Sequence, residues 1–269
     1  MDYKEIRVSK LVTMITKKDT LFCGNFTIDP YQYCEFSCSY CDSSQSDSIN
    51  VKTNAVEILK DEIENLQKGR IIIGSVHDPY QEAEKKYRLT RKLLSVIQEF
   101  NFPCHILTKS PSVLRDLDIL TSLKDCIVTI SISSLKKSVC SIFEPNISPP
   151  PQRLNAINTL SENNIISGLA IIPILPYISD NELEKIIKYA NDYNALYVLH
   201  KSLELKGDQK NIFLALIDKF NPNLVSKYQK LYGESYLPDQ NYLNRIKGKI
   251  DTICKNIGLE NSLERFCKH

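Results

Sequence analysis

Residues 28–41 read Ile-Asp-Pro-Tyr-Gln-Tyr-Cys-Glu-Phe-Ser-Cys-Ser-Tyr-Cys and place three cysteines within eight positions. Residues 22–28 have the composition of a β-strand, and the Asp-Pro-Tyr sequence at 29–31 ends it with turn chemistry. The cysteines therefore lie on one loop after a strand, close enough together to bind a single inorganic centre. They are Cys34, Cys38 and Cys41.

The number of these cysteines limits the kind of centre that they can hold. An iron–sulfur cube held by three cysteines leaves one iron with open coordination sites, as a catalytic zinc with three protein ligands keeps an open position. The spacing also allows a zinc site completed by a distant cysteine or histidine, or three cysteines that are close by accident. Spacing alone favours a [4Fe–4S] cluster and leaves the other two possibilities open.

Apolar strands alternate with amphipathic helices along most of the chain. After residues 22–28, further strands are predicted at 71–73, 105–107, 127–132, 166–172 and 196–199. Helices are predicted at 53–68, 84–100, 112–123, 153–162 and 181–189. This alternation is typical of parallel strands covered by helices, in an open doubly wound sheet or in a barrel. Six units favour an α/β fold with a partial (β/α)6 barrel over residues 1–200.

Residues 201–269 lose the alternation and contain predicted helices at 211–220, 223–231 and 241–257, joined by polar and proline-containing turns. We interpret them as a C-terminal helical extension of the same domain. A chain of 269 residues, with 42% apolar and 25% charged residues, is within the range of one α/β barrel domain.

Charge and apolar runs indicate where the protein works. The net charge is +2, and residues 200–269 hold 12 Lys and Arg against 8 Asp and Glu, too mild an asymmetry to establish nucleic-acid binding. No run approaches the roughly 18 apolar residues of a membrane helix, and the start of the chain lacks the apolar core of a secretion signal. Nine unevenly spaced cysteines do not read as a secreted disulfide framework. We therefore expect a cytoplasmic protein without a membrane segment.

The cysteine pattern, with Tyr40 before the third cysteine, resembles the radical S-adenosylmethionine (SAM) superfamily, where it follows the first barrel strand. A closer resemblance, to the spore photoproduct lyase-like branch and its DNA photolyase-related radical relatives, runs from about Asn25 to Leu199. The matching stretches, in chain order, are Asp29–Gln32, His77–Gln81 with Glu84, Leu89–Arg91, Thr108–Ser110, Arg115–Asp116, Ser131–Ser133, Phe143–Pro145, Arg153–Leu154 and Pro173–Pro176.

This resemblance implies a radical SAM enzyme of a lyase-like kind. In such enzymes SAM chelates the open iron of the [4Fe–4S] cluster, and one electron cleaves its sulfonium bond to release a 5′-deoxyadenosyl radical that abstracts a substrate hydrogen. The protein contributes position, charge and exclusion of water, while the cofactor carries the hard chemistry. A reduced ferredoxin or flavodoxin is the expected electron donor.

The resemblance also assigns roles to six side chains at strand ends and in the loop. They are Tyr40, His77, Asp78, Lys109, Ser131 and Ser133. The lysine would pair with the cofactor carboxylate, and the histidine and aspartate would hold its amino end. The two serines share one side of a strand and could offer hydroxyls to the methionyl or ribose groups. The tyrosine, the one candidate catalytic residue, would pack beside the cluster and the adenine.

Each of these residues also has a structural interpretation. Lys109 could be a surface lysine, Asp78 could open a turn, the serines could satisfy neighbouring backbone, and the tyrosine could anchor the loop. For Glu144 and Arg153, which match family positions, we predict an ion pair that braces a loop.

Three positions depart from the family pattern. Ser75 stands where the spore enzyme carries a cysteine hydrogen donor, and a serine O–H is a poor donor to a radical. Repair of thymine photoproducts is therefore doubtful. Tyr33 replaces the usual glycine before the first cysteine, and Asp42 follows the third where an aromatic residue is common, so we expect loop geometry and substrate access to differ.

The sequence does not name the substrate or the oligomeric state. A nucleic-acid base or nucleoside is the first choice by family analogy, and a peptide side chain is the second. The alternative is a noncatalytic iron–sulfur or zinc-binding redox sensor or scaffold. A zinc hydrolase is disfavoured, because the four histidines include no pair at helical spacing. The other cysteines are interpreted as core thiols: Cys23, Cys104, Cys126, Cys140, Cys254 and Cys267.

Overall fold

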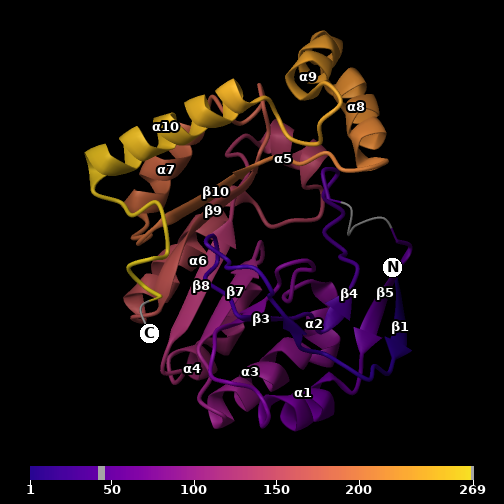
Figure 1. Ribbon diagram of the computed structural model, residues 1–269, viewed down its shortest axis with the longest axis vertical. Coiled ribbons are helices and arrows are strands. Elements are labelled where there is room, and N and C mark those ends of the chain that lie inside the picture. Colours follow the sequence, from indigo (N-terminus) through magenta and orange to yellow (C-terminus); the bar gives the residue numbers. More distant parts are fainter. Residues whose placement is uncertain (42–45, 268–269) are drawn as a thin grey trace.

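In the part of the chain that the computed structural model describes, residues 1–41 and 46–267, the main sheet has six parallel strands and one antiparallel edge strand (Figure 1). Its order is β10-β9-β8-β7-β6-β3-β2. The strands are β2 (Thr13–Met14), β3 (Phe26–Ile28), β6 (Ile71–Ile73), β7 (Cys104–Thr108), β8 (Cys126–Ser131), β9 (Ile166–Ile174) and β10 (Val198–Ser202). Asp42, one of the three departures from the family pattern, lies outside the described residues.

Helices follow the strands and pack against the sheet or one another. α6 (Pro150–Glu162) contacts β8 and β9, α7 (Leu183–Asp192) contacts β9, and α1 (Ala55–Ile63) packs on α3 (Leu89–Glu99). Side chains alternate along each strand, so Val128 belongs to the large core shared with the helices and Ile127 to a separate apolar cluster. This arrangement confirms the predicted α/β fold with a partial (β/α)6 barrel.

Several predicted helices have different bounds in the structure. The helix predicted at 84–100 is two helices, α2 (Glu82–Tyr87) and α3, because Arg88 between them adopts a left-handed φ of 51°. The helix predicted at 112–123 is a 3-10 helix, η2 (Pro111–Asp116), followed by α4 (Leu117–Leu120). The helix predicted at 153–162 begins earlier, because Pro150 and Pro151 form the first turn of α6, where proline is tolerated.

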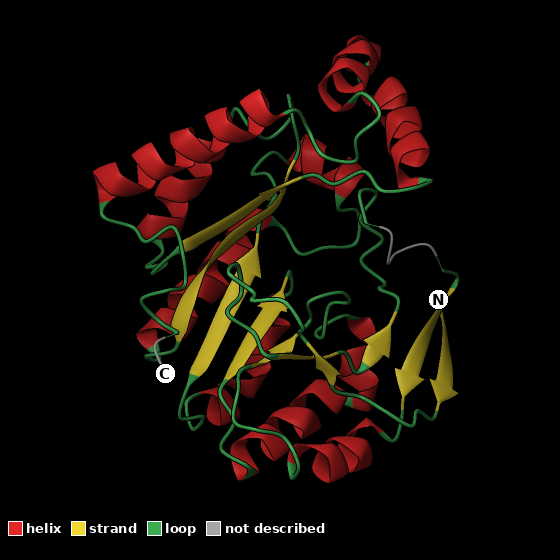
Figure 2. Cartoon of the chain, viewed as in Figure 1, coloured by secondary structure: helices red, strands yellow, loops and turns green. Residues whose placement is uncertain are grey.

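A small second sheet and a short helix were not predicted. The sheet has the order β1-β5-β4, with β1 (Asp2–Ile6), β5 (Ser48–Lys52) and β4 (Tyr31–Gln32), and it lies beside the main sheet in Figure 2. Ile49 and Val51 of β5 are buried in one apolar cluster with Tyr31 of β4. Strand β4 of this sheet directly precedes the cysteine loop in the chain. The short helix is α5 (Lys137–Phe143).

The C-terminal region contains the three predicted helices. They are α8 (Gln209–Phe220), α9 (Val225–Tyr232) after a short 3-10 turn, and α10 (Gln240–Ile257). α10 packs on α7, as Figure 1 shows, and the Tyr242 hydroxyl donates a hydrogen bond to Asp180 Oδ2 at 3.2 Å. The division of the domain at residue 200 stays a prediction. Among the described residues, no helix is both long and apolar enough to cross a membrane.

A buried histidine on β7 links β8 to Phe22 and to Tyr197, which directly precedes β10. His105 Nδ1 lies 3.0 Å from the Phe22 carbonyl oxygen, and its Nε2 lies 2.6 Å from Thr129 Oγ1. The carbonyl requires an N–H at Nδ1, so Nε2 accepts from the threonine, which in turn accepts from the Tyr197 hydroxyl at 2.6 Å. With a neutral imidazole, every partner in this chain of hydrogen bonds is satisfied.

This histidine predicts a loss of stability in mild acid. Burial lowers the pKa of His105 from 6.5 to about 4. Above pH 6.5 the imidazole of His105 is neutral in both the folded and the unfolded chain. Between pH 6.5 and about 4 it is protonated in the unfolded chain and stays neutral in the folded chain. The free energy of unfolding should therefore fall as pH drops from about 6.5 to about 4, by about 3 kcal/mol from this residue. Urea unfolding of the cluster-free chain measures it, and a His105→Gln variant should show a flatter pH profile.

Candidate active site

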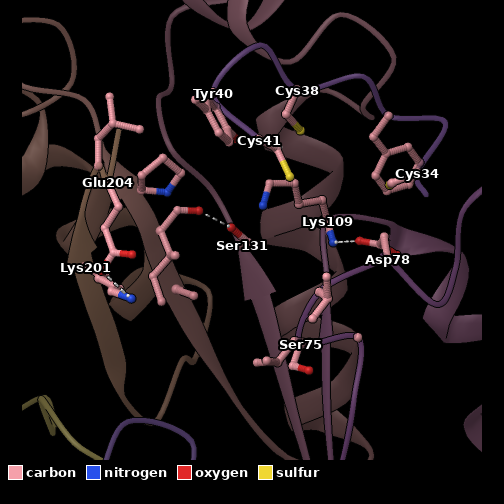
Figure 3. Close-up of a pocket in the computed structure, with 18 of the residues that line it drawn as sticks. Cys34, Cys38, Tyr40, Cys41, Ser75, Asp78, Lys109, Ser131, Lys201 and Glu204 are labelled. Carbon is pink, nitrogen blue, oxygen red and sulfur yellow. Dashed lines mark hydrogen bonds and ion pairs between the residues drawn. The ribbon is translucent and has the colours of Figure 1, made fainter. Parts of the chain in front are cut away.

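A cavity of about 470 Å³ lies where the parallel strands end (Figure 3). Loops that follow parallel strands meet at this edge of a barrel, which is where ligands bind. Seven of the nine side chains predicted for the site line the cavity: Cys34, Cys38, Tyr40, Cys41, Asp78, Lys109 and Ser131. His77 and Ser133 do not line it.

The cysteine loop is held by a glutamine that precedes α2. Gln81 is fully buried; its Nε2 donates to the Tyr33 carbonyl at 3.1 Å, and its Oε1 accepts from the Glu35 backbone N–H at 3.0 Å. These two bonds fix the chain on both sides of Cys34. Tyr33 adopts a left-handed φ of 72°, the conformation that glycine adopts most easily. The departure from the family glycine therefore leaves a tyrosine in a glycine-like conformation.

Contacts from distant segments fix the rest of the loop. The Glu35 carboxylate accepts from the Ala83 backbone N–H at 2.7 Å and from the Tyr3 hydroxyl at 2.8 Å. The Ser39 backbone N–H donates to the Phe143 carbonyl at 3.1 Å, and its own carbonyl accepts from Gln209 Nε2 at 2.8 Å. Segments from both ends of the chain thus determine where the thiols point.

The environment of the thiols suits metal-bound thiolate. Burial raises the pKa of Cys34 to about 12, although backbone N–H groups of Phe36 and Asp78 donate to its sulfur and oppose that rise. Burial also raises the pKa of Cys38, and the nearby Lys109 ammonium opposes it. Hydrogen bonds to cysteine sulfur and a nearby cation both stabilise thiolate ligands of an iron–sulfur cluster. The three thiols fit such a cluster as its ligands.

The described residues do not form a site for a single metal ion. Within residues 1–41 and 46–267, no three His, Cys, Asp or Glu side chains are grouped to hold one metal ion. The three cysteines instead stand around the cavity, with Cys38 and Cys41 above Lys109 in Figure 3.

Asp78 joins the ends of two strands. Its Oδ1 accepts from Thr108 Oγ1 at 2.7 Å and from the Tyr80 backbone N–H at 2.9 Å, and its Oδ2 accepts from the Lys109 backbone N–H at 2.6 Å. The bond to Tyr80 is the turn predicted as the structural alternative. Burial raises the pKa of Asp78, against these hydrogen bonds. The carboxylate is thus oriented rigidly at the cavity wall, beside Lys109.

The strand end before Asp78 depends on a glycine. Gly74 has φ +88°, and a Cβ there would lie 2.3 Å from the Leu107 carbonyl oxygen. We expect Gly74→Ala to lower the free energy of unfolding by about 2 kcal/mol or more, because the backbone must shift. In contrast, Gly248→Ala in α10 meets no atom within 4 Å and should raise it by about 0.5–1 kcal/mol. Urea unfolding compares the two; equal effects would contradict the strain at residue 74.

Tyr40 is fixed by a buried ion pair. Its hydroxyl donates to Glu144 Oε1 at 2.5 Å and lies 3.3 Å from Ser133 Oγ. Glu144 Oε2 accepts from Arg153 at 2.8 Å, and the same guanidinium donates to the Ser131 carbonyl at 2.8 Å. The predicted Glu144–Arg153 ion pair is confirmed, and it braces the cysteine loop against the end of β8.

The remaining predicted residues have structural contacts. Ser131 lines the cavity, and its hydroxyl donates to the Ile172 carbonyl at 3.1 Å. Ser133 contacts Tyr40 behind the cavity wall. His77 packs edge-on against Tyr33, with ring centroids 6.5 Å apart, and its backbone N–H donates to Asp29. Ser131 therefore has the backbone partner that its structural interpretation required, whereas Ser133 contacts a side chain.

The sequence analysis did not identify three charged residues of the cavity wall. Lys201, Glu204 and Lys206 follow or end β10 and line the cavity. Their only sequence signal is their position after the last strand of the barrel, where any charged surface residue could stand. The other six cysteines all lie among the described residues, and none of them lines this cavity.

One family model matches more than half of the chain. Residues 28–190 match the family model of the radical SAM superfamily. An uncharacterized protein of Mycobacterium tuberculosis is 24% identical over 234 residues, which cover 79% of this chain and 69% of that protein. A second, from Methanocaldococcus jannaschii, is 29% identical over 197 residues, which cover 70% of this chain and 73% of that protein.

Solved structures share the fold. Spore photoproduct lyase complexed with dinucleoside spore photoproduct aligns with a TM-score of 0.75 and 13% identity, over 95% of this chain and 79% of the other. Streptococcus suis SuiB bound to its precursor peptide SuiA aligns with a TM-score of 0.59 and 13% identity, over 88% and 47%. Because the family model covers more than half of its residues, this chain belongs to the radical SAM superfamily.

Proposed function

We propose that this chain cleaves SAM reductively at a [4Fe–4S] cluster held by Cys34, Cys38 and Cys41. The observation that carries the proposal is that three thiols, an oriented carboxylate and an ammonium line one cavity at the strand ends. When bound there, the cluster and SAM supply a 5′-deoxyadenosyl radical that abstracts a substrate hydrogen. The chain's own residues bind, orient and shield these groups.

The residues on the wall divide the binding of SAM between its charged ends. The Lys109 ammonium would donate to the SAM carboxylate, and Asp78 would accept from the SAM ammonium. Asp78 is suited to this because three hydrogen bonds fix both of its oxygens. The ring of Tyr40, held through Glu144 and 6.0 Å from Lys109 Nζ, would pack beside the adenine.

Electron supply and substrate follow from the family and the cavity. A reduced ferredoxin or flavodoxin is the proposed electron donor. A nucleic-acid base or nucleoside is the first proposed substrate, and a peptide side chain is the second. Ser75 lines the cavity where a hydrogen-donating thiol would be needed for the spore enzyme's repair reaction. We therefore do not propose repair of thymine photoproducts.

Anaerobic reconstitution tests the proposal. The chain is loaded with iron and sulfide, reduced with dithionite and given SAM, and 5′-deoxyadenosine is measured by chromatography. The expected result is 5′-deoxyadenosine that requires both dithionite and the reconstituted cluster. A complete cluster that yields no product, alone or with candidate nucleosides and peptides, would refute the enzyme and support the noncatalytic sensor or scaffold instead.

A further inference from the structure

The cavity has a second charged wall, opposite the groups proposed to bind SAM. Those groups come from the cysteine loop and the ends of β6, β7 and β8, whereas Lys201, Glu204 and Lys206 come from the end of β10 and the loop after it. Figure 3 shows Lys201 and Glu204 across the cavity from Asp78 and Lys109. β10 is an edge strand of the main sheet, and none of these three side chains belongs to the groups proposed to bind SAM.

Lys201 and Lys206 both form ion pairs with the carboxylate of Glu204. Lys201 Nζ lies 2.7 Å from Glu204 Oε1, and Lys206 Nζ lies 2.7 Å from Glu204 Oε2. Partial burial acts to raise the pKa of Glu204, but hydrogen bonds from both lysines outweigh it, and the pKa lies below its usual value. The carboxylate is thus ionised and holds two ammonium groups in convergent positions, and the triad carries a net charge of about +1.

We propose that this triad is the subsite for a phosphate group of the substrate, in a reaction that rests on the function proposed above. An ammonium has three N–H donors and no acceptor, so it can serve a carboxylate and a phosphate oxygen together. The lysine side chains are 49% and 60% exposed, so a ligand in the cavity can reach them.

An exposed aromatic ring beside the triad favours phosphate over carboxylate as the anion. The Lys206 ammonium lies 5.2 Å from the ring centroid of Tyr236, and that residue is 47% exposed. The Leu205 backbone N–H donates to the Tyr236 carbonyl at 2.9 Å, which fixes the backbone of Tyr236 next to the triad. A cation pair beside an open aromatic face binds a phosphate next to a flat, stackable group. The phosphate ester of a nucleotide has this form, and a phosphorylated peptide shares only the anion.

The test is the binding of matched probes to the cluster-loaded chain, which calorimetry measures. The probes are a nucleoside monophosphate with its nucleoside, and a phosphoserine tripeptide with its serine form. We expect at least one phosphorylated probe to bind about tenfold more tightly than its uncharged form, and less so at high salt. The two probe pairs show whether the phosphate belongs to a nucleotide or a peptide.

Two double variants identify the site. In Lys201→Gln with Lys206→Gln the preference for phosphate should disappear, and each single variant should lose part of it. The matched control, Lys185→Gln with Lys227→Gln, removes two lysines that also lie beside tyrosine rings but do not line the cavity, and it should keep the preference. Circular dichroism confirms that the variants fold.

The outcomes separate this proposal from the function on which it rests. No preference in the natural chain, or a preference that survives the Lys201/Lys206 variant, overturns the subsite. A chain that makes 5′-deoxyadenosine but shows no preference loses only the subsite. A chain that prefers phosphate but never cleaves SAM keeps the subsite as a binding site and loses the proposed reaction.

Discussion

Replacing Cys38 by alanine is expected to lower 5′-deoxyadenosine production by on the order of 100-fold or more. Cys38 is buried in the core of the cysteine loop and lines the cavity. With two thiols left, the iron–sulfur cube has two irons without protein ligands, and a complete cluster should not assemble. Iron and sulfide per chain, the visible absorption spectrum and the product assay measure the effect together.

A second cysteine provides the control for that variant. Cys140 does not line the cavity, and its Sγ donates to the Ser134 carbonyl at 3.4 Å, a bond that serine can also make. Cys140→Ser should keep the cluster and the activity within about twofold, because it loses neither a ligand nor a hydrogen bond. If Cys140→Ser lost the cluster and Cys38→Ala kept it, the assignment of ligands would be wrong.

The second large effect is expected for Arg153→Leu. Arg153 and Glu144 are 0% and 3% exposed, so the leucine variant leaves a carboxylate buried without its cation. Burial acts to raise the pKa of Glu144, and the Arg153 guanidinium is the main group that outweighs it and keeps the pKa low. The free energy of unfolding should fall by about 3–5 kcal/mol at pH 7.

Urea unfolding of the cluster-free chain measures this loss, and two further variants interpret it. Adding Glu144→Gln to Arg153→Leu removes the buried charge and should recover part of the loss. Arg7→Leu breaks an ion pair whose side chains are 73% and 71% exposed, and it should change stability by less than about 1 kcal/mol. An Arg153→Leu variant no less stable than Arg7→Leu would show that the buried pair contributes little.

Sequence patterns predicted the barrel because its physical cause is local. Strands such as Ile71–Ile73 are wholly apolar and their helices have one apolar face, so the alternation is visible without the fold. The small sheet was missed because strands such as Asp2–Ile6 and Ser48–Lys52 are mostly polar and gain their burial from each other. Ile49 and Val51 are fully buried only through contact with residues such as Tyr31, which is distant in sequence.

Sequence patterns pointed to one side of the candidate site and missed the other. Three cysteines within eight residues are informative by spacing, and the family pattern pointed to Asp78 and Lys109. Lys201 and Glu204 carry no such pattern, because their importance depends on the strand that brings them to the cavity. Likewise Gln81 looked like part of a motif, and only the fold shows that it holds both peptide groups next to Cys34.

The hydrogen bonds of Gln81 also bear on how the proposed metal centre is assembled. A zinc finger has no folded state until its metal binds, so losing the metal means unfolding. Here the loop around Cys34 takes its shape from Gln81 and from partners such as Phe143 and Gln209, none of which is a thiol. If the proposed cluster is bound there, we therefore expect the chain to lose it to oxygen and to accept a new one without refolding, because the loop keeps its shape without the inorganic centre.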